Sequence, residues 1–222
     1  MMFTFLIPFV SVLIGAAIAL YFKPKTPQGM KLILSFSGAF LLAILLLDML
    51  PHIYANEDYK VGIWMLLGII SQNLLEFFSK GAEHGHAHPT KSKHLPWTLL
   101  ISLCIHAFLE GIPLDIQPSL LWGVSIHKIP IGLVLCVLLF QTKTSSASQW
   151  IALIVFALMS PVGSLVGFWI NIDFMNHYLE PFVVGILFHI STTILFESSE
   201  GHNFNLQKFI AILLGMGIAT LL

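Results

Sequence analysis

Eight runs of about 20 apolar residues divide this chain, and they constrain its fold more than any other feature. A helix of about that length crosses the hydrocarbon core of a bilayer and satisfies its own backbone hydrogen bonds there. The pattern therefore predicts an all-α integral membrane protein with one transmembrane domain over residues 1–222. We expect helices at residues 3–22, 31–52, 60–79, 97–114, 118–140, 148–171, 178–198 and 205–222.

The composition excludes several classes of protein. Charged residues make up 9% of the chain and hydrophobic residues 57%, whereas a soluble domain carries about 25% charged residues. The net charge of -1 and the lack of arginine argue against a nucleic-acid partner. The first apolar run is followed, not preceded, by lysines, which favours a retained helix over a cleaved signal peptide. No HExxH, GxSxG or glycine-rich phosphate loop occurs, so we expect neither an enzyme nor a bound cofactor.

The lysines predict an orientation in the membrane. Counting the adjacent helix ends, the connections after the first, third, fifth and seventh helices hold eight lysines, and those after the even-numbered helices hold only Lys60. Because positive charge is retained on the cytoplasmic side, both termini should lie outside and the polar loop at residues 80–96 inside. The small size, without further domains, fits the inner membrane of a bacterial cell.

That loop carries a short histidine tract. His84, His86 and His88 alternate with small residues, and this spacing predicts loose capture of a borderline metal cation. A solvated polar loop without a ligand is the other interpretation.

The span at residues 97–114 holds the residues with the strongest chemical signal. His106 and Glu110 are four residues apart, on one face of the helix and near its middle. An ionisable group at that depth costs about 2.5–3.5 kcal/mol on insertion scales, so it is seldom there for packing alone. Imidazole and carboxylate are ligands of zinc and related divalent ions. With His127 from the next span as a third ligand, they predict a metal site; a hydrogen-bonded or proton-relay network is the alternative.

Lys128 is the unusual neighbour of this group. A buried ammonium needs a counter-charge, or it loses its proton through desolvation. Glu110, Asp48 and Glu76 are the candidate partners. The alternative is a lysine whose side chain extends to a membrane interface.

Two further spans carry residues that can line a pathway for the ion. Asp48 and His52 form another pair four residues apart, at the end of the second span. They predict either the mouth of a pathway or an interfacial pair. His189 lies deep in the seventh span and has the same two interpretations.

Four motifs along the chain resemble signatures of the ZIP (Zrt-, Irt-like protein) family of divalent-metal transporters. His106-Ala-Phe-Leu-Glu110-Gly111 resembles the family's helix-4 signature, and His127-Lys128-Ile-Pro130-Ile-Gly132 resembles its helix-5 signature. Asp48-Met-Leu-Pro51 is similar to the end of helix 2, and Ser160-Pro161-Val-Gly163 to helix 6. The resemblance implies a 3+2+3 bundle with an inverted repeat. It also implies movement of zinc, iron or manganese toward the cytoplasm, with His106, Glu110 and His127 as ligands at mid-membrane and one bundle rocking against the other.

The departures from that family concern its second metal position. Lys128 stands where the family has an acid, Ile131 where it has the bridging acid, and Ala107 where it has an asparagine. Our hypothesis is that the Lys128 ammonium takes the place of the second cation and leaves a site for one metal ion. A relative that binds metal without transporting it, as a sensor or interaction protein, is the alternative function, and a metal-dependent intramembrane hydrolase is a third. The sequence also leaves room for a homodimer.

Overall fold

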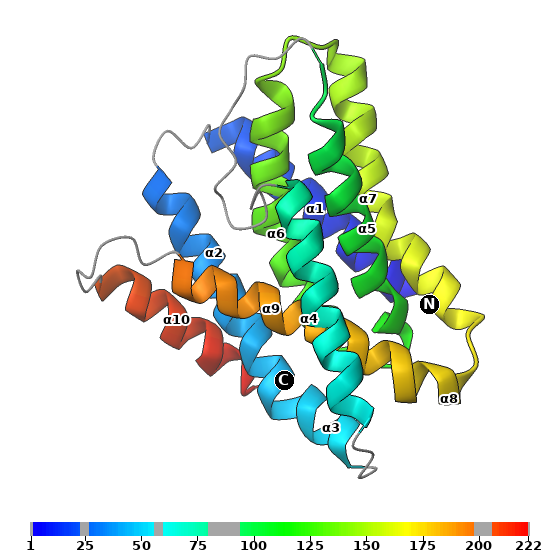
Figure 1. Cartoon of the computed structure of the whole chain (residues 1–222). Helices are drawn as coiled ribbons and strands as arrows, with labels where there is room; N and C mark the ends of the chain where they lie inside the picture. Colours follow the sequence, from blue (N-terminus) through cyan, green and yellow to red (C-terminus); the bar gives the residue numbers. More distant parts are fainter. Residues whose placement is uncertain (1, 23–26, 56–59, 80–93, 198–205, 222) are drawn as a thin grey trace.

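Every regular element that the structure describes is a helix, as the apolar runs predict (Figure 1). The structure is a computed structural model and describes residues 2–22, 27–55, 60–79, 94–197 and 206–221. The α-helices are α1 (Met2–Phe22), α2 (Pro27–Ile44), α3 (Leu50–Tyr54), α4 (Lys60–Ser79), α5 (Trp97–Gly111), α6 (Pro118–Phe140), α7 (Ser146–Phe168), α8 (Ile172–Phe174), α9 (Glu180–Glu197) and α10 (Leu206–Ala219). The π-helical segments η1 (Leu45–Met49) and η4 (Met175–Leu179) and the 3₁₀ turn η3 (Ile112–Asp115) extend three of them.

Seven of these helices are long and apolar enough to cross a bilayer, so the chain is an integral membrane protein. They cover residues Met2–Phe22, Gly29–Tyr54, Lys60–Ser79, Trp97–Asp115, Pro118–Phe140, Ser146–Phe168 and Ile172–Phe196. The eighth predicted span forms as α10, which has 14 residues in the described part of the chain. At a rise of about 1.5 Å per residue, this length is shorter than a hydrocarbon core.

The end of the second span and the start of the seventh differ from the predicted bounds for the same reason. The second is helical from Pro27 through Tyr54, and the seventh begins at Ile172, before the predicted residue 178. Both contain a π-helical segment followed by a proline, Pro51 or Pro181. A proline lacks an N–H and its ring crowds the carbonyl four residues earlier, so widening the preceding turn lets the helix continue. The apolar pattern does not detect this continuation, because polar residues occupy the first turns of the seventh span.

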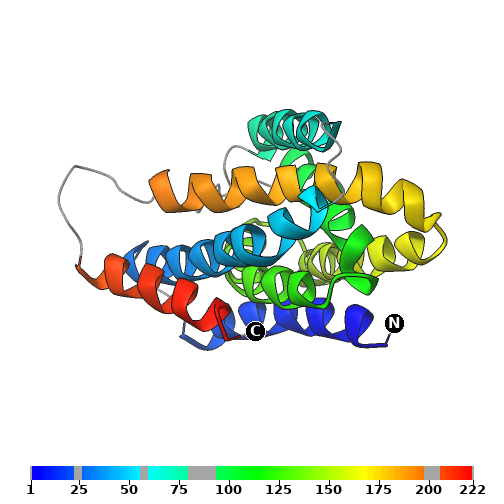
Figure 2. The same cartoon turned by 90° about the horizontal axis from the view of Figure 1, so that it is seen from below.

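The helices pack as two groups. In the first, α1 lies against α6 and α7, and α5 lies against α7; in the second, α2 lies against α10 and α9, and α4 lies against α9. Figure 2 shows α4 and α1 on opposite sides of the molecule, with α9 and α2 between them. Contacts of α2 with α6 and of α4 with α5 join the groups. The most enclosed span is α6, and it carries two of the predicted site residues.

Glycines let the helices of the first group approach closely beside the site. A Cβ added to Gly132 on α6 would come within 2.5 Å of the Val12 carbonyl oxygen on α1. A Cβ on Gly111 of α5 would overlap the Ser160 backbone on α7. Small residues at such contacts are typical of membrane helices, whose association depends on tight packing. These contacts hold α6 against α1 and α5 against α7.

The two ends of the bundle can be told apart by their elements. We name the α8 end by the elements that meet there: the start of α1, α3, η3 and α8 (Figure 1). Thr4 and Asp115 connect α1 and η3 at this end, since the Thr4 hydroxyl donates to Asp115 Oδ1 over 2.5 Å. The opposite end holds the end of α1, the end of α6 and the start of α7.

Candidate metal centre

The two strongest predicted ligands lie side by side in the interior of the bundle. His106 and Glu110 are on α5, and their side chains are 2% and 0% exposed. His106 Nε2 is 3.3 Å from Glu110 Oε2, as the spacing of four residues along a helix predicts. In the described part of the chain, His106 Nδ1 has no hydrogen-bond partner. A buried imidazole nitrogen without a partner is costly, and a metal ion can satisfy it.

Lys128 supplies the counter-charge of Glu110. Its Nζ forms an ion pair with Glu110 Oε1, and the lysine side chain is 1% exposed. The same ammonium lies 4.7 Å from the centre of the Phe156 ring on α7, within the range of a cation–π contact. The side chain therefore stays in the interior and does not extend to an interface. Of the three acids considered from the sequence, the structure pairs Lys128 with Glu110.

Ser160 is a neighbour of Glu110 that reasoning about ligand types did not single out. Its hydroxyl lies 2.8 Å from the Ala107 carbonyl oxygen, to which it donates, and 3.4 Å from Glu110 Oε1. The serine comes from α7, so three helices surround the carboxylate. The available signal was its position before Pro161 in the motif that resembles helix 6 of the ZIP family.

His127 reaches the same interior from α6. Its side chain is fully buried, and it is near enough to Glu110 for the two to interact electrostatically. Across the described ranges, however, no three histidine, cysteine or acidic side chains are arranged closely enough to hold one metal ion. One oxygen of Glu110 is held by Lys128 instead. The donor set fits a divalent cation in chemistry, and a cation would need to displace the ammonium to use both carboxylate oxygens.

A second pair links α4 and α9. His189 Nε2 is 2.8 Å from Glu76 Oε2, and both side chains are partly exposed. Glu76 lies in the last turn of α4, at the end opposite α8. The predicted pathway residue His189 is thus paired with an acid from a helix distant in sequence. Apolar periodicity alone gives no signal for this pairing.

A third polar cluster lies at the α8 end. Ser119 donates to Asp48 Oδ2, and Gln117 Nε2 donates to Glu180 Oε1 over 2.8 Å. His52 Nε2 is 4.0 Å from the same Glu180 oxygen. Glu180 was missed from the sequence, although its position directly before Pro181 resembles that of Asp48 shortly before Pro51.

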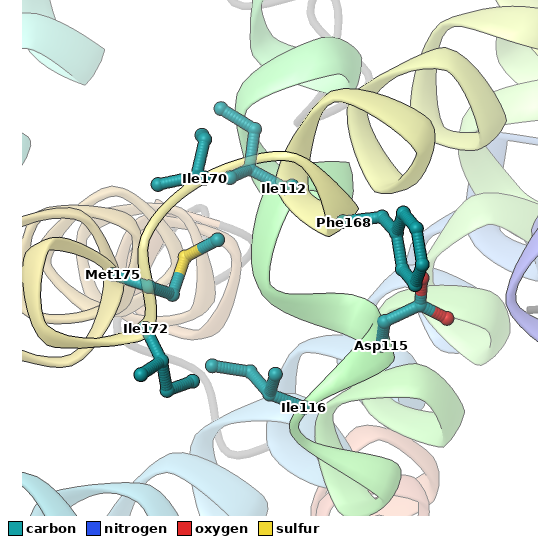
Figure 3. Close-up of a pocket in the computed structure, with 8 residues that line it drawn as sticks. Ile112, Asp115, Ile116, Phe168, Ile170, Ile172 and Met175 are labelled. Carbon is teal, nitrogen blue, oxygen red and sulfur yellow. The ribbon is translucent and has the colours of Figure 1, made fainter.

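One described cavity at this end is apolar. It has a volume of about 430 Å³ and is lined by isoleucines, Phe168 and Met175, with one acid, Asp115 (Figure 3). Isoleucine and phenylalanine offer no ligand to a cation, so this cavity does not extend the metal centre. The predicted capture residues His84, His86 and His88 lie outside the described residues.

Comparison with known proteins assigns the chain to a family. Residues 79–222 match the family described as ZIP Zinc transporter. They include His106, Glu110, His127, Lys128 and Ser160, which we call the central cluster. The chain is also 32% identical over 107 residues to "Protein zntD" of Dictyostelium discoideum. That match covers 40% of this chain and 16% of the relative, so this chain corresponds to a small part of that protein. Since the family match extends over more than half of its length, the chain belongs to the ZIP family of zinc transporters.

Proposed function

We propose that this protein carries a divalent cation, in the first place zinc, toward the cytoplasm through a site formed by His106, Glu110 and His127. The observation that carries the proposal is the Glu110 carboxylate, fully buried in a membrane-spanning helix with an imidazole at 3.3 Å. Such a group is expensive in a membrane and chemically matched to zinc. Membership of a family of metal transporters supports the same assignment.

Lys128 makes this a site for a single ion in our proposal. In the structure the ammonium balances the charge of Glu110. A divalent cation that binds Glu110 competes with that ammonium, and the two positive charges repel in a medium of low dielectric constant. The ammonium then has the Phe156 ring beside it as a remaining favourable contact. The lysine therefore limits how tightly the cation is held, which favours its release.

The lysines support an orientation of the protein in the membrane. Among the described residues, Lys31, Lys143 and Lys208 lie at the end opposite α8, and Lys60 lies at the α8 end. Positive charge marks the cytoplasmic side of a membrane protein. We therefore place the α8 end and the N-terminus outside the cytoplasm, and take the cell membrane as the location.

The contact pattern supports the inverted repeat as part of this proposal. The contact of α1 with α6 has its counterpart in that of α7 with α5. The contact of α2 with α10 has its counterpart in that of α9 with α4, and both central helices carry a π-helical segment before a proline. A two-fold axis that exchanges the first and last three spans relates each pair. Because α5, α6 and α7 belong to one helix group, the site moves with that group when one bundle rocks against the other.

Zinc uptake into proteoliposomes tests the proposal. The purified chain should accumulate zinc above empty vesicles, and Glu110→Gln should lose that uptake because it removes the ligand charge. Asp173→Asn, which removes an exposed carboxylate on α8, should retain uptake. Uptake unchanged by Glu110→Gln, or zinc binding by the wild-type chain without any uptake, would refute it.

A further inference from the structure

We infer that Glu180, together with His52 and Asp48, forms a second binding site for a divalent cation, at the α8 end and separate from the central cluster. The inference rests on the proposed function only for the class of ion. In the present structure, neutral donors from α6 and the residue before it occupy the carboxylates of this site.

Glu180 is buried, and one of its two carboxylate oxygens lacks a hydrogen-bond partner among the described residues. Its side chain is 1% exposed, and Gln117 donates to one carboxylate oxygen over 2.8 Å. The other oxygen, Oε2, is buried and has no hydrogen-bond partner among the described residues. A buried carboxylate that keeps only one neutral donor is strongly disfavoured. A cation is the ligand that would satisfy it.

The neighbours of Glu180 are metal ligands by chemistry. His52 Nε2 is 4.0 Å from Glu180 Oε1, and its ring is 55% exposed, so an ion from solution can reach it. Asp48 lies one helical turn before His52 and close enough for its charge to act on Glu180. Two carboxylates and an imidazole from two helices are a ligand set for zinc, iron or manganese. In the described structure these three side chains are not arranged closely enough to hold one ion. Joint coordination therefore requires Glu180 and Asp48 to leave Gln117 and Ser119.

The backbone is π-helical at Asp48 and directly before Glu180. Asp48 lies within the π-helical segment η1, and Glu180 directly follows the π-helical segment η4. A π-helical turn inserts a residue and re-aims the side chains around it, and such turns are frequent at functional sites. The two segments therefore bring the two acids to the same end of the bundle from helices that are far apart in sequence.

The donors now bound to the acids come from the other helix group. Gln117 precedes α6 and Ser119 lies in its first turn, whereas the two acids belong to the α2–α3 and α9 helices. A cation at this site would replace these donors and so remove these two polar contacts between the groups. Since α6 also carries His127 and Lys128, occupancy of the outer site is coupled to the helix that forms the central one.

Cation binding to the full-length chain in detergent tests the inference. The background variant has alanine in place of His106, His127 and the three loop histidines His84, His86 and His88, and it retains the Glu110–Lys128 pair. Zinc and cobalt(II) binding are measured by equilibrium dialysis against a competing chelator. Glu180→Gln in this background should bind one ion per chain fewer, or bind it at least about tenfold more weakly.

Two matched variants make the result specific. His52→Ala changes a largely exposed side chain, so it should fold and still weaken binding by about tenfold. Asp173→Asn removes an exposed acid of the neighbouring α8 and should leave binding as in the background. Equal binding by the background, Glu180→Gln and His52→Ala would overturn the inference. If the wild-type chain transports no zinc but Glu180→Gln still removes one bound ion, the proposed function fails and the outer site stands.

Discussion

The ammonium of Lys128 on α6 forms an ion pair with the carboxylate of Glu110 on α5, and both side chains are at most 1% exposed. The pair joins the two helices that carry the proposed metal ligands. Together these two residues contribute no net charge to the site. The two residues should therefore depend on each other in both stability and ion binding.

Removing one member of the pair should destabilise the protein more than removing both. Glu110→Ala leaves an uncompensated buried ammonium and should lower the free energy of unfolding by about 3–5 kcal/mol. The double variant Glu110→Ala with Lys128→Met should recover much of this loss, because no buried charge remains. Chemical unfolding in detergent measures both values. Additive losses in the double variant would show that the pair is not coupled.

Removing the lysine alone should strengthen cation binding. Lys128→Met eliminates the repulsion between the ammonium and a bound divalent ion, and should raise zinc affinity by about tenfold or more. Lys143→Met, at an exposed position after α6, is the matched control and should bind as the wild type does. Zinc titration with a competing chelator gives the affinity and the number of bound ions. Two tightly held ions in the Glu180→Gln chain, which lacks the proposed outer site, would contradict a role for Lys128 in place of the second cation.

The Ser160 hydroxyl should contribute modestly to the stability of the site. Ser160→Ala removes the hydroxyl that donates to the Ala107 carbonyl oxygen and lies near Glu110. Its loss should lower the free energy of unfolding by about 1 kcal/mol. Ser164→Ala, one turn later on α7, tests whether any buried serine of this helix has the same effect. Thermal unfolding of the two variants compares them. An equal decrease in the unfolding temperature of both variants would show that Ser160 has no specific role.

Because α1 and α6 lie close together, a side chain at position 132 should lower the stability of the protein. Gly132→Ala places a Cβ within 2.5 Å of the Val12 carbonyl oxygen and should destabilise the protein by about 1–3 kcal/mol. Gly217→Ala in α10 meets open space and should be neutral or stabilising by about 0.5–1 kcal/mol, because alanine favours a helix. Unfolding in detergent distinguishes the two variants. A neutral Gly132→Ala would mean that the helix contact is looser than described.

Length, composition and residue spacing predicted most of the helices and the place of His106 and Glu110 on one of them. A chain with this few charges can bury its apolar runs only in a membrane, so seven spans follow from length and composition. The span predicted at residues 118–140 is observed as Pro118–Phe140. The spacing of His106 and Glu110 likewise determines that they share a face of α5, because that relationship is internal to one helix.

Relationships between helices were decided by the tertiary structure. The sequence allowed three acids as partners of Lys128, and the packing of α5 and α6 against α7 selected Glu110. The burial of Glu180 and the pairing of Glu76 with His189 also depend on how α9 is rotated against its neighbours. Membrane helices are apolar on all sides, so their sequences contain no polar face that indicates which side of the helix turns toward the interior of the bundle. Close backbone contacts at glycines set that rotation, and they form only when the whole bundle is assembled.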